Sequence, residues 1–220
     1  MKDRYELLIF DWDGTLFDSI GWIVSSLQHA ARESGFEVPS ESAARSVIGL
    51  SLPQAMQTLY PGSTEAMAQR LVHHYREIYN TRTADALGLF MGVETMLLDF
   101  RRLGYRLAVA TGKARSGLDR VLREIGMNGF FHATRCADET ASKPHPLMIY
   151  QLLEELAVTG DRALLIGDSL HDLRMAQNAG IDAVAVACGA NTRHELMELR
   201  QLHCLETTTE LAQLFALESA

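Results

Sequence analysis

Short apolar runs alternate with stretches of helical periodicity along most of the chain. Residues 7–10 run straight into a glycine-containing turn, which is typical of a buried strand in a parallel sheet. Similar runs predict strands at residues 106–110, 131–134, 163–167 and 183–187, and a short one near Cys204. Helical spacing predicts helices at residues 93–103, 115–125, 149–156 and 170–179. This alternation indicates an α/β fold built on a doubly wound parallel sheet.

The segment after the first strand has a different pattern. From residue 18 to residue 86, apolar positions recur at helical spacing and no stretch reads as a strand. Asp18 or Ser19 is the predicted cap of the first helix in this segment. We therefore expect an α-helical cap domain at residues 18–86, inserted into a core domain formed by residues 1–17 and 87–220. The tail after Glu210 is expected to fray.

Composition and charge narrow the classes of partner. The 220 residues suit a core domain with an insertion, and a hydrophobic fraction of 47% supports a sizeable core. The net charge is −8 and no basic stretch stands out, so we expect neither nucleic acid nor an anionic membrane as partner. An acidic protein that handles anionic substrates needs a local positive site, such as a metal ion with a lysine.

The cysteines and apolar runs bear on the compartment. Cys136, Cys188 and Cys204 are an odd number without metal-ligand spacing, which indicates reduced thiols. No apolar run approaches the ~18 residues of a membrane span, and the first is too short for a signal peptide. We expect a cytoplasmic protein, and the sequence leaves open whether it is a monomer or a homodimer.

Polar residues gather where the predicted strands end. Asp11 and Asp13 follow the first strand, and Thr111 and Gly112 follow the second. Lys143 lies in a loop, and Asp168 and Asp172 follow a later strand. The carboxyl ends of parallel strands share one edge of the sheet, so we expect these groups to converge there.

This set of groups suits a divalent cation and a phosphate. Mg²⁺ prefers oxygen ligands and shares phosphate oxygens with the protein, while helix N-termini and a lysine bind the remaining phosphate charge. A carboxylate in this setting is able to attack phosphorus, and a second acid protonates the leaving alkoxide and then activates water.

The same residues resemble a known family. The stretches 11–16 (Asp-Trp-Asp-Gly-Thr-Leu), 111–112 (Thr-Gly), 143–144 (Lys-Pro) and 167–172 (Gly-Asp-Ser-Leu-His-Asp) look like the four ordered motifs of haloacid dehalogenase-like hydrolases. The helical segment is similar to the cap that such proteins carry between the first two motifs. The resemblance spans nearly the whole chain.

The resemblance implies a role for each motif residue. Asp11 would be the nucleophile and a Mg²⁺ ligand, and Asp13 the general acid and base, its backbone carbonyl also meeting the metal. Thr111, Gly112 and Lys143 would hold the transferring phosphoryl group. The remaining metal ligands would be Asp168 and Asp172.

Asp13 and the cap narrow the implied chemistry. Relatives that dehalogenate or cleave phosphonates lack a carboxylate two residues after the nucleophile, so Asp13 favours phosphate esters. The chain looks most like phosphoglycolate phosphatases, with Gly49, Ser51 and Leu52 in the substrate-loop region of the cap. Sugar phosphomutases carry an arginine where Leu52 stands. The implied partner is a small phosphorylated metabolite.

Other interpretations stay open. A sugar phosphomutase or an inorganic pyrophosphatase uses the same scaffold, a phospho-accepting signalling module uses similar residue types, and a silent binding protein is a third possibility. Lys113 is expected to be a surface charge, and His73 and His74 a solvated cap face. His171 is expected to be exposed or to lie behind the site, and whether any of these three histidines contributes is not decided by the sequence.

Overall fold

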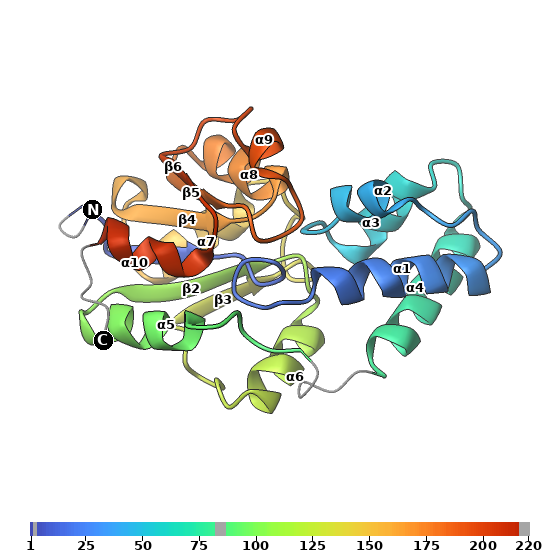
Figure 1. Ribbon diagram of the computed structural model, residues 1–220, viewed down its shortest axis with the longest axis horizontal. Helices are drawn as coiled ribbons and strands as arrows, with labels where there is room; N and C mark the ends of the chain where they lie inside the picture. Colours follow the sequence, from blue (N-terminus) through green and yellow to red (C-terminus); the bar gives the residue numbers. More distant parts are fainter. Residues whose placement is uncertain (2–3, 82–86, 216–220) are drawn as a thin grey trace.

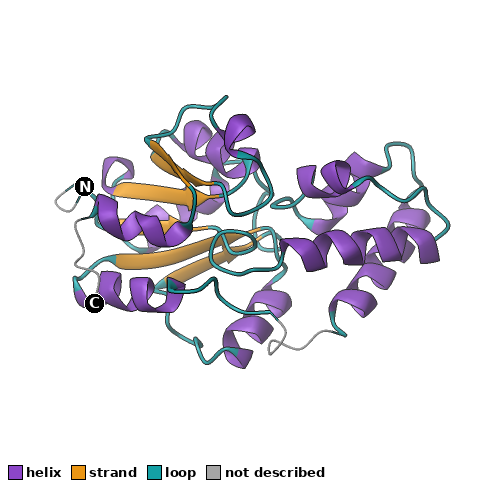
Figure 2. Cartoon of the chain, in the orientation of Figure 1, coloured by secondary structure: helices purple, strands orange, loops and turns teal. Residues whose placement is uncertain are grey.

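The computed structural model describes residues 1, 4–81 and 87–215. A parallel sheet of six strands in the order β3-β2-β1-β4-β5-β6 forms its centre (Figures 1 and 2). The strands are β1 (Leu7–Phe10), β2 (Arg106–Thr111), β3 (Ala133–Cys136), β4 (Ala163–Gly167), β5 (Asp182–Val186) and β6 (His203–Leu205). The expected doubly wound α/β fold is confirmed.

The central position of β1 follows from its sequence. All four of its side chains are apolar and fully buried. Leu8 and Phe10 face one hydrophobic core, and Leu7 and Ile9 face the other. A strand that is apolar on both faces is stable only where helices cover both sides of the sheet, which is the arrangement of parallel sheets.

Helices cover both faces. One core contains residues of α5 (Val93–Arg102), α6 (Arg115–Glu124) and α10 (Leu211–Leu214). The other contains residues of α7 (Leu147–Glu155), α8 (Leu170–Ala179) and α9 (Arg193–Leu196). Two 3-10 turns, η2 (Gly160–Arg162) and η3 (Thr208–Glu210), precede β4 and α10.

Four helices form an insertion between β1 and β2. They are α1 (Ile20–Glu33), α2 (Glu41–Ser46), α3 (Leu52–Leu59) and α4 (Glu65–Tyr79), and they pack around a core of their own. Figure 1 shows them at the end of the sheet where the strands finish. Within the described residues of the insertion no strand is present. We propose that the insertion begins between residues 17 and 18. Its predicted end, at residue 86, lies within residues 82–86, which are outside the described residues.

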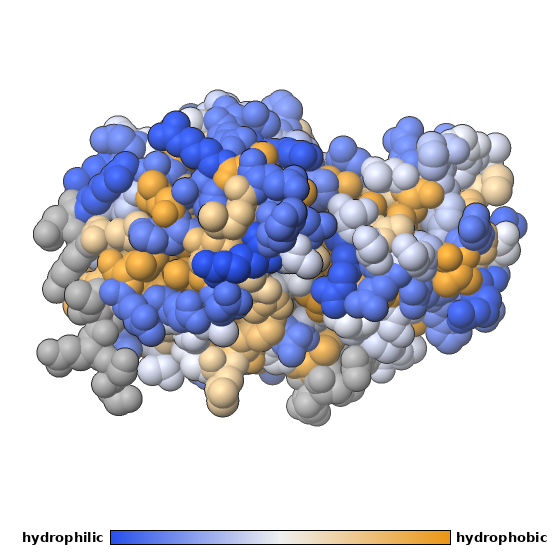
Figure 3. Space-filling model, turned by 45° about the horizontal axis from the view of Figure 1, so that its top comes forward, coloured by the Kyte–Doolittle hydropathy of each residue, from blue (hydrophilic) through white to orange (hydrophobic). Residues whose placement is uncertain are grey.

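The surface and the thiols are in keeping with the composition. Figure 3 shows a larger and a smaller mass whose visible face is mostly hydrophilic. No helix among the described residues is both long and apolar enough to cross a membrane. All three cysteines are free thiols.

One strand differs from its predicted position by more than one residue. The strand expected at residues 131–134 is found as β3, two residues later, because β3 pairs with β2 from Ala108–Ala133 to Thr111–Cys136 and so ends level with it. Phe131 belongs to the core instead: its ring lies 6.2 Å from that of Trp12 in an edge-on contact. From the sequence alone, an apolar core residue that precedes a strand cannot be distinguished from a residue of the strand itself.

The expectation of a frayed tail is wrong for residues 211–215. Leu211 and Phe215 are fully buried. The Phe215 ring lies 5.1 Å from that of Phe100 and 5.3 Å from that of Tyr105, both edge-on. Aromatic pairs in this geometry add to the stabilisation from burial.

We therefore expect Phe215→Ala to lower the free energy of unfolding by about 3–5 kcal/mol, the usual effect of removing a buried phenylalanine. Urea unfolding followed by circular dichroism measures the change. Met91→Ala is the control, because Met91 is 96% exposed and should change stability by no more than about 0.5 kcal/mol. Equal stability of the two variants would show that the tail does not support the core.

Candidate active site

Three buried carboxylates meet at the centre of the sheet edge. Asp11 follows β1, Asp168 follows the adjacent β4, and Asp172 lies in the first turn of α8. Each offers an oxygen, and these oxygens lie within 4.8 Å of one another. The structure thus brings together three of the predicted metal ligands.

Lys143 lies between two of these carboxylates. Its Nζ is 2.7 Å from Asp11 Oδ1 and 2.6 Å from Asp172 Oδ1, and its side chain is fully buried. Burial by itself would lower the pKa of Lys143, but the charges of Asp11 and Asp172 outweigh burial and raise it. Lys143 is therefore an ammonium that holds both carboxylates in place.

Burial and mutual repulsion disfavour the charged form of the carboxylates and so raise their pKa. Burial, followed by the charge of Asp172, raises the pKa of Asp11 well above its ordinary value despite Lys143. The same two causes raise the pKa of Asp168 to about 7. Asp168 accepts hydrogen bonds from Thr15 Oγ1 at 2.6 Å and from Ala190 N at 2.7 Å, which fix its orientation.

The donor set fits a hard divalent cation. One ammonium against three carboxylates leaves two negative charges uncompensated when all three are ionised. Although Lys143 is close, Asp11 Oδ1 receives no well-directed hydrogen bond from the described part of the chain. Buried carboxylate oxygens in excess of their donors are the ligands that Mg²⁺ and Ca²⁺ prefer.

Asp13 lies apart from these three carboxylates and faces the insertion. Its Oδ1 accepts a hydrogen bond from Ser19 Oγ at 2.5 Å and lies 3.1 Å from Lys113 Nζ. The metal contact expected of its backbone carbonyl stays a prediction. Its side chain does not belong to the group of three carboxylates that could share an ion, and it lines the cavity beneath the insertion instead.

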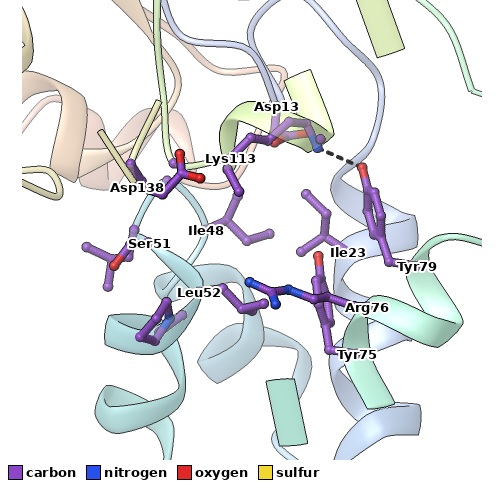
Figure 4. Close-up of a pocket in the computed structure, with 18 of the residues that line it drawn as sticks. Asp13, Ile23, Ile48, Ser51, Leu52, Tyr75, Arg76, Tyr79, Lys113 and Asp138 are labelled. Carbon is purple, nitrogen blue, oxygen red and sulfur yellow. Dashed lines mark hydrogen bonds and ion pairs between the residues drawn. The ribbon is translucent and has the colours of Figure 1, made fainter. Parts of the chain in front are cut away.

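Lys113 is not the surface charge that was expected. Its side chain is only 11% exposed, and its Nζ donates to the Tyr79 hydroxyl at 2.8 Å and lies 4.7 Å from the centre of that ring (Figure 4). Burial alone would lower its pKa, but Asp13 and Tyr79 outweigh burial and raise it. Because Tyr79 ends α4 and Lys113 follows β2, no local pattern shows this contact.

Ser19 has a different role from the one predicted. It occupies the cap position of α1, but its side chain makes no capping hydrogen bond. The fully buried hydroxyl instead orients Asp13. Serine is common at helix caps, so the sequence could not distinguish the two uses.

Thr111 and Gly112 lie at the end of β2. Thr111 is buried, and its Oγ1 accepts a hydrogen bond from Lys113 N at 3.2 Å. At Gly112, a Cβ would lie 2.6 Å from both Gly49 O and Leu50 O. Only glycine lets the cap loop approach this closely.

Other contacts hold the insertion against the core. Ser51 N donates to Ser142 Oγ at 2.8 Å, and Arg45 Nη1 donates to Gly189 O at 3.1 Å. His171 Nε2 lies 2.9 Å from Ser46 O, so this histidine contacts the cap backbone. Burial lowers the pKa of His171. The cap is therefore closed over the carboxylates.

A cavity of about 330 Å³ remains beneath the closed cap. Asp11, Asp13 and Gly112 line its core side, and Gly49, Ser51 and Leu52 line its cap side, so the predicted cap residues face the site (Figure 4).

His73 and His74 lie outside this cavity. His73 Nε2 is 3.4 Å from Glu77 Oε1 in an exposed pair, and His74 Nδ1 is 3.1 Å from Ser34 Oγ. Neither is among the residues that line the cavity.

Comparison with known proteins identifies the family. Residues 8–186 match the family model described as haloacid dehalogenase-like hydrolase. The chain belongs to this family. The buried carboxylates are consistent with the divalent metal site typical of haloacid dehalogenase-like hydrolases.

Individual relatives of this haloacid dehalogenase-like hydrolase carry different names. The tyrosine-protein kinase PtkA of Mycobacterium tuberculosis is 34% identical over 185 residues, which are 84% of this chain but only 62% of PtkA. The phosphoglycolate phosphatase of Vibrio cholerae is 29% identical over 84% of this chain and 86% of its own. A hydrolase structure from Pseudomonas syringae has a TM-score of 0.88 at 20% identity, covering 98% of this chain and 100% of its own, which shows the fold.

The fit between Gly112 and the cap loop predicts the effect of one methyl group. We expect Gly112→Ala to push the loop away from the site and to lower kcat/KM for an aryl phosphate at least ~100-fold, since displacements near 1 Å have effects of that size. Gly21→Ala is the control, because nothing lies within 4 Å of its added Cβ. Wild-type activity of Gly112→Ala would mean that closure does not need this contact.

The raised carboxylate pKa values predict a pH-dependent response to Mg²⁺. In the metal-free protein, the raised pKa of Asp168 means that its protonated form stabilises the fold. This stabilisation is complete at pH values below the ordinary pKa of an aspartate and is lost as the pH rises through about 7. Mg²⁺ needs the ionised form, so it competes with protons. Saturating Mg²⁺ should therefore raise Tm more at pH 8 than at pH 6, and Asp168→Asn should reduce the difference, as measured by scanning calorimetry. An equal rise at both pH values in the wild type would contradict this account.

Proposed function

We propose that the protein is a Mg²⁺-dependent phosphatase that hydrolyses a small phosphomonoester through an aspartyl-phosphate on Asp11. The observation that carries the proposal is the fully buried Lys143 ammonium bound between Asp11 and Asp172, with Asp168 beside them. Such a concentration of buried charge is costly without a reaction or an ion that uses it.

The residues divide into two groups by their position. Asp11, Asp168 and Asp172 would hold Mg²⁺, which supplies positive charge to phosphoryl oxygens when bound. Lys143 and the backbone at Thr111 and Gly112 would bind the other phosphoryl oxygens. The phosphorus is thereby held beside the free carboxylate oxygen of Asp11.

Two displacements then complete the reaction. In the first, an Asp11 oxygen forms a bond to phosphorus, the bond to the ester oxygen breaks, and protonated Asp13 gives its proton to the leaving alkoxide. In the second, Asp13 takes a proton from water as the water oxygen attacks phosphorus, which releases orthophosphate and restores the Asp11 carboxylate. Ser19 and Lys113 would orient Asp13 for both transfers.

The closed cap supports the proposal of a hydrolase whose aspartyl-phosphate intermediate forms away from bulk water. With the cap loop resting on Gly112, bulk water is kept from the site during the first displacement. Phosphoglycolate is the first substrate suggested by similarity, since a relative from Vibrio cholerae is named phosphoglycolate phosphatase. An isomerised sugar phosphate as product would instead indicate a phosphomutase, and pyrophosphate cleavage without an organic product a pyrophosphatase.

Substitution of the two aspartates tests the assigned roles. We expect Asp11→Asn to abolish Mg²⁺-dependent release of phosphate from an aryl phosphate. Asp13→Asn should lower kcat by about 10²–10⁴-fold, the usual contribution of general acid–base catalysis, with a much smaller change in phosphate affinity. Steady-state kinetics and inhibition by orthophosphate give the two quantities. Full turnover by Asp11→Asn would exclude Asp11 as the nucleophile.

A further inference from the structure

The cavity under the cap is larger than a two-carbon leaving group needs. Its volume of about 330 Å³ falls in the range of pockets that enclose drug-sized molecules. A small hydroxyacid ester would leave most of the cavity to water. The space beyond the phosphoryl site is therefore available to a bulkier alcohol.

The cap side of this cavity is mainly apolar. Helix α1, the loop before α3, the first turn of α3, and α4 each contribute side chains, which Figure 4 shows in part. They are Ile23, Leu27, Ile48, Leu50, Leu52 and Tyr75. Each methylene of a substrate that fits an apolar pocket changes specificity by roughly 10- to 200-fold. This wall favours an aliphatic or aromatic body over a short polar one.

Arg76 adds a positive charge to the same wall. It extends from α4, lines the cavity, and has no side-chain partner within residues 4–81 and 87–215. Figure 4 shows its guanidinium directed into the cavity, well separated from Lys113, which is already paired with Asp13. An unpaired guanidinium in such a position is suited to a carboxylate or phosphate, which it binds through paired hydrogen bonds.

A second arginine reinforces this charge. Arg120, on α6, also lines the cavity, and its buried Nε has no hydrogen-bond partner among the described residues. Its contact with Glu124 is 3.8 Å long. Asp138, by contrast, accepts a hydrogen bond from Arg115 N. Outside the phosphoryl site the cavity is therefore lined by two guanidinium groups, those of Arg76 and Arg120, and by one further carboxylate, that of Asp138, so that positive groups outnumber negative ones.

We propose that the substrate is the phosphomonoester of a bulky apolar or aromatic alcohol that carries a second anionic group, and that Arg76 binds this group. The proposal rests on the phosphatase function proposed above. The phosphoryl end is fixed by Asp11 and Lys143, so the alcohol extends toward α4. Its body then contacts the apolar wall and its far end reaches the guanidinium.

Benzyl phosphates test the two parts of this proposal without changing the kind of leaving group. The substrates are 2-phosphoglycolate, 4-carbamoylbenzyl phosphate and 4-carboxybenzyl phosphate, assayed with Mg²⁺ by phosphate release. We expect both benzyl esters to exceed 2-phosphoglycolate in kcat/KM by about 100-fold. The carboxylate should be preferred over the isosteric amide by about 10- to 100-fold, the usual effect of a charged hydrogen bond.

Variants then assign the preference to one side chain. Arg76→Gln should reduce the carboxylate-to-amide ratio to about one, because the neutral amide does not use the positive charge of the guanidinium. Arg123→Gln, on the exposed part of α6 outside the cavity, should keep the wild-type ratio. A higher kcat/KM for 2-phosphoglycolate than for either benzyl ester, or a carboxylate preference that survives Arg76→Gln, would overturn the proposal. If no ester releases phosphate, the phosphatase function itself fails.

Discussion

The structure depends on keeping one ammonium and three carboxylates together away from water. At an effective dielectric constant near 20, two like charges about 4 Å apart repel by about 4 kcal/mol. Three carboxylates at such distances would force each other apart or take up protons. Lys143, buried at hydrogen-bonding distance from two of them, relieves part of this repulsion. A divalent cation would relieve the remainder, which is why a site of this kind is both a strain on the fold and a place for chemistry.

The fold brings these charges together by simple means. β1 and β4 are adjacent and parallel, so Asp11 and Asp168 follow strands that end side by side. α8 begins with a capping box in which Ser169 and Asp172 bind each other's backbone, and this fixes Asp172 in the first helical turn. The apolar strands thus supply a rigid base from which short polar segments extend.

The insertion links the cavity to Asp13, the proposed general acid. Tyr79 on the cap contacts Lys113 on the core, and Lys113 contacts Asp13. Gly112 lets the cap loop rest on the end of β2. Movement of the cap would therefore alter the surroundings of Asp13 as well as the cavity. The same cap supplies the apolar wall and Arg76, so in the proposed function one element would control both specificity and access to water.

Much of this architecture was predictable because its determinants are local. Apolar runs fix buried strands, the spacing of apolar residues fixes helices, and strand ends in a parallel sheet share one edge; Asp11, Thr111, Lys143 and Asp168 could be assigned to the site on that basis. Strand limits were less certain, because Phe131 is as apolar as a strand residue but packs on Trp12.

For three residues the interpretation of the sequence differed from the contacts in the structure. Lys113 looked like a surface charge, Ser19 like a helix cap, and Phe215 like part of a fraying tail. The sequence by itself determined the elements and the chemistry of the strand ends, since both follow from neighbouring residues. Only the tertiary structure decided the partners of Lys113, the closure of the cap and the shape of the cavity, because these arise where segments distant along the chain meet.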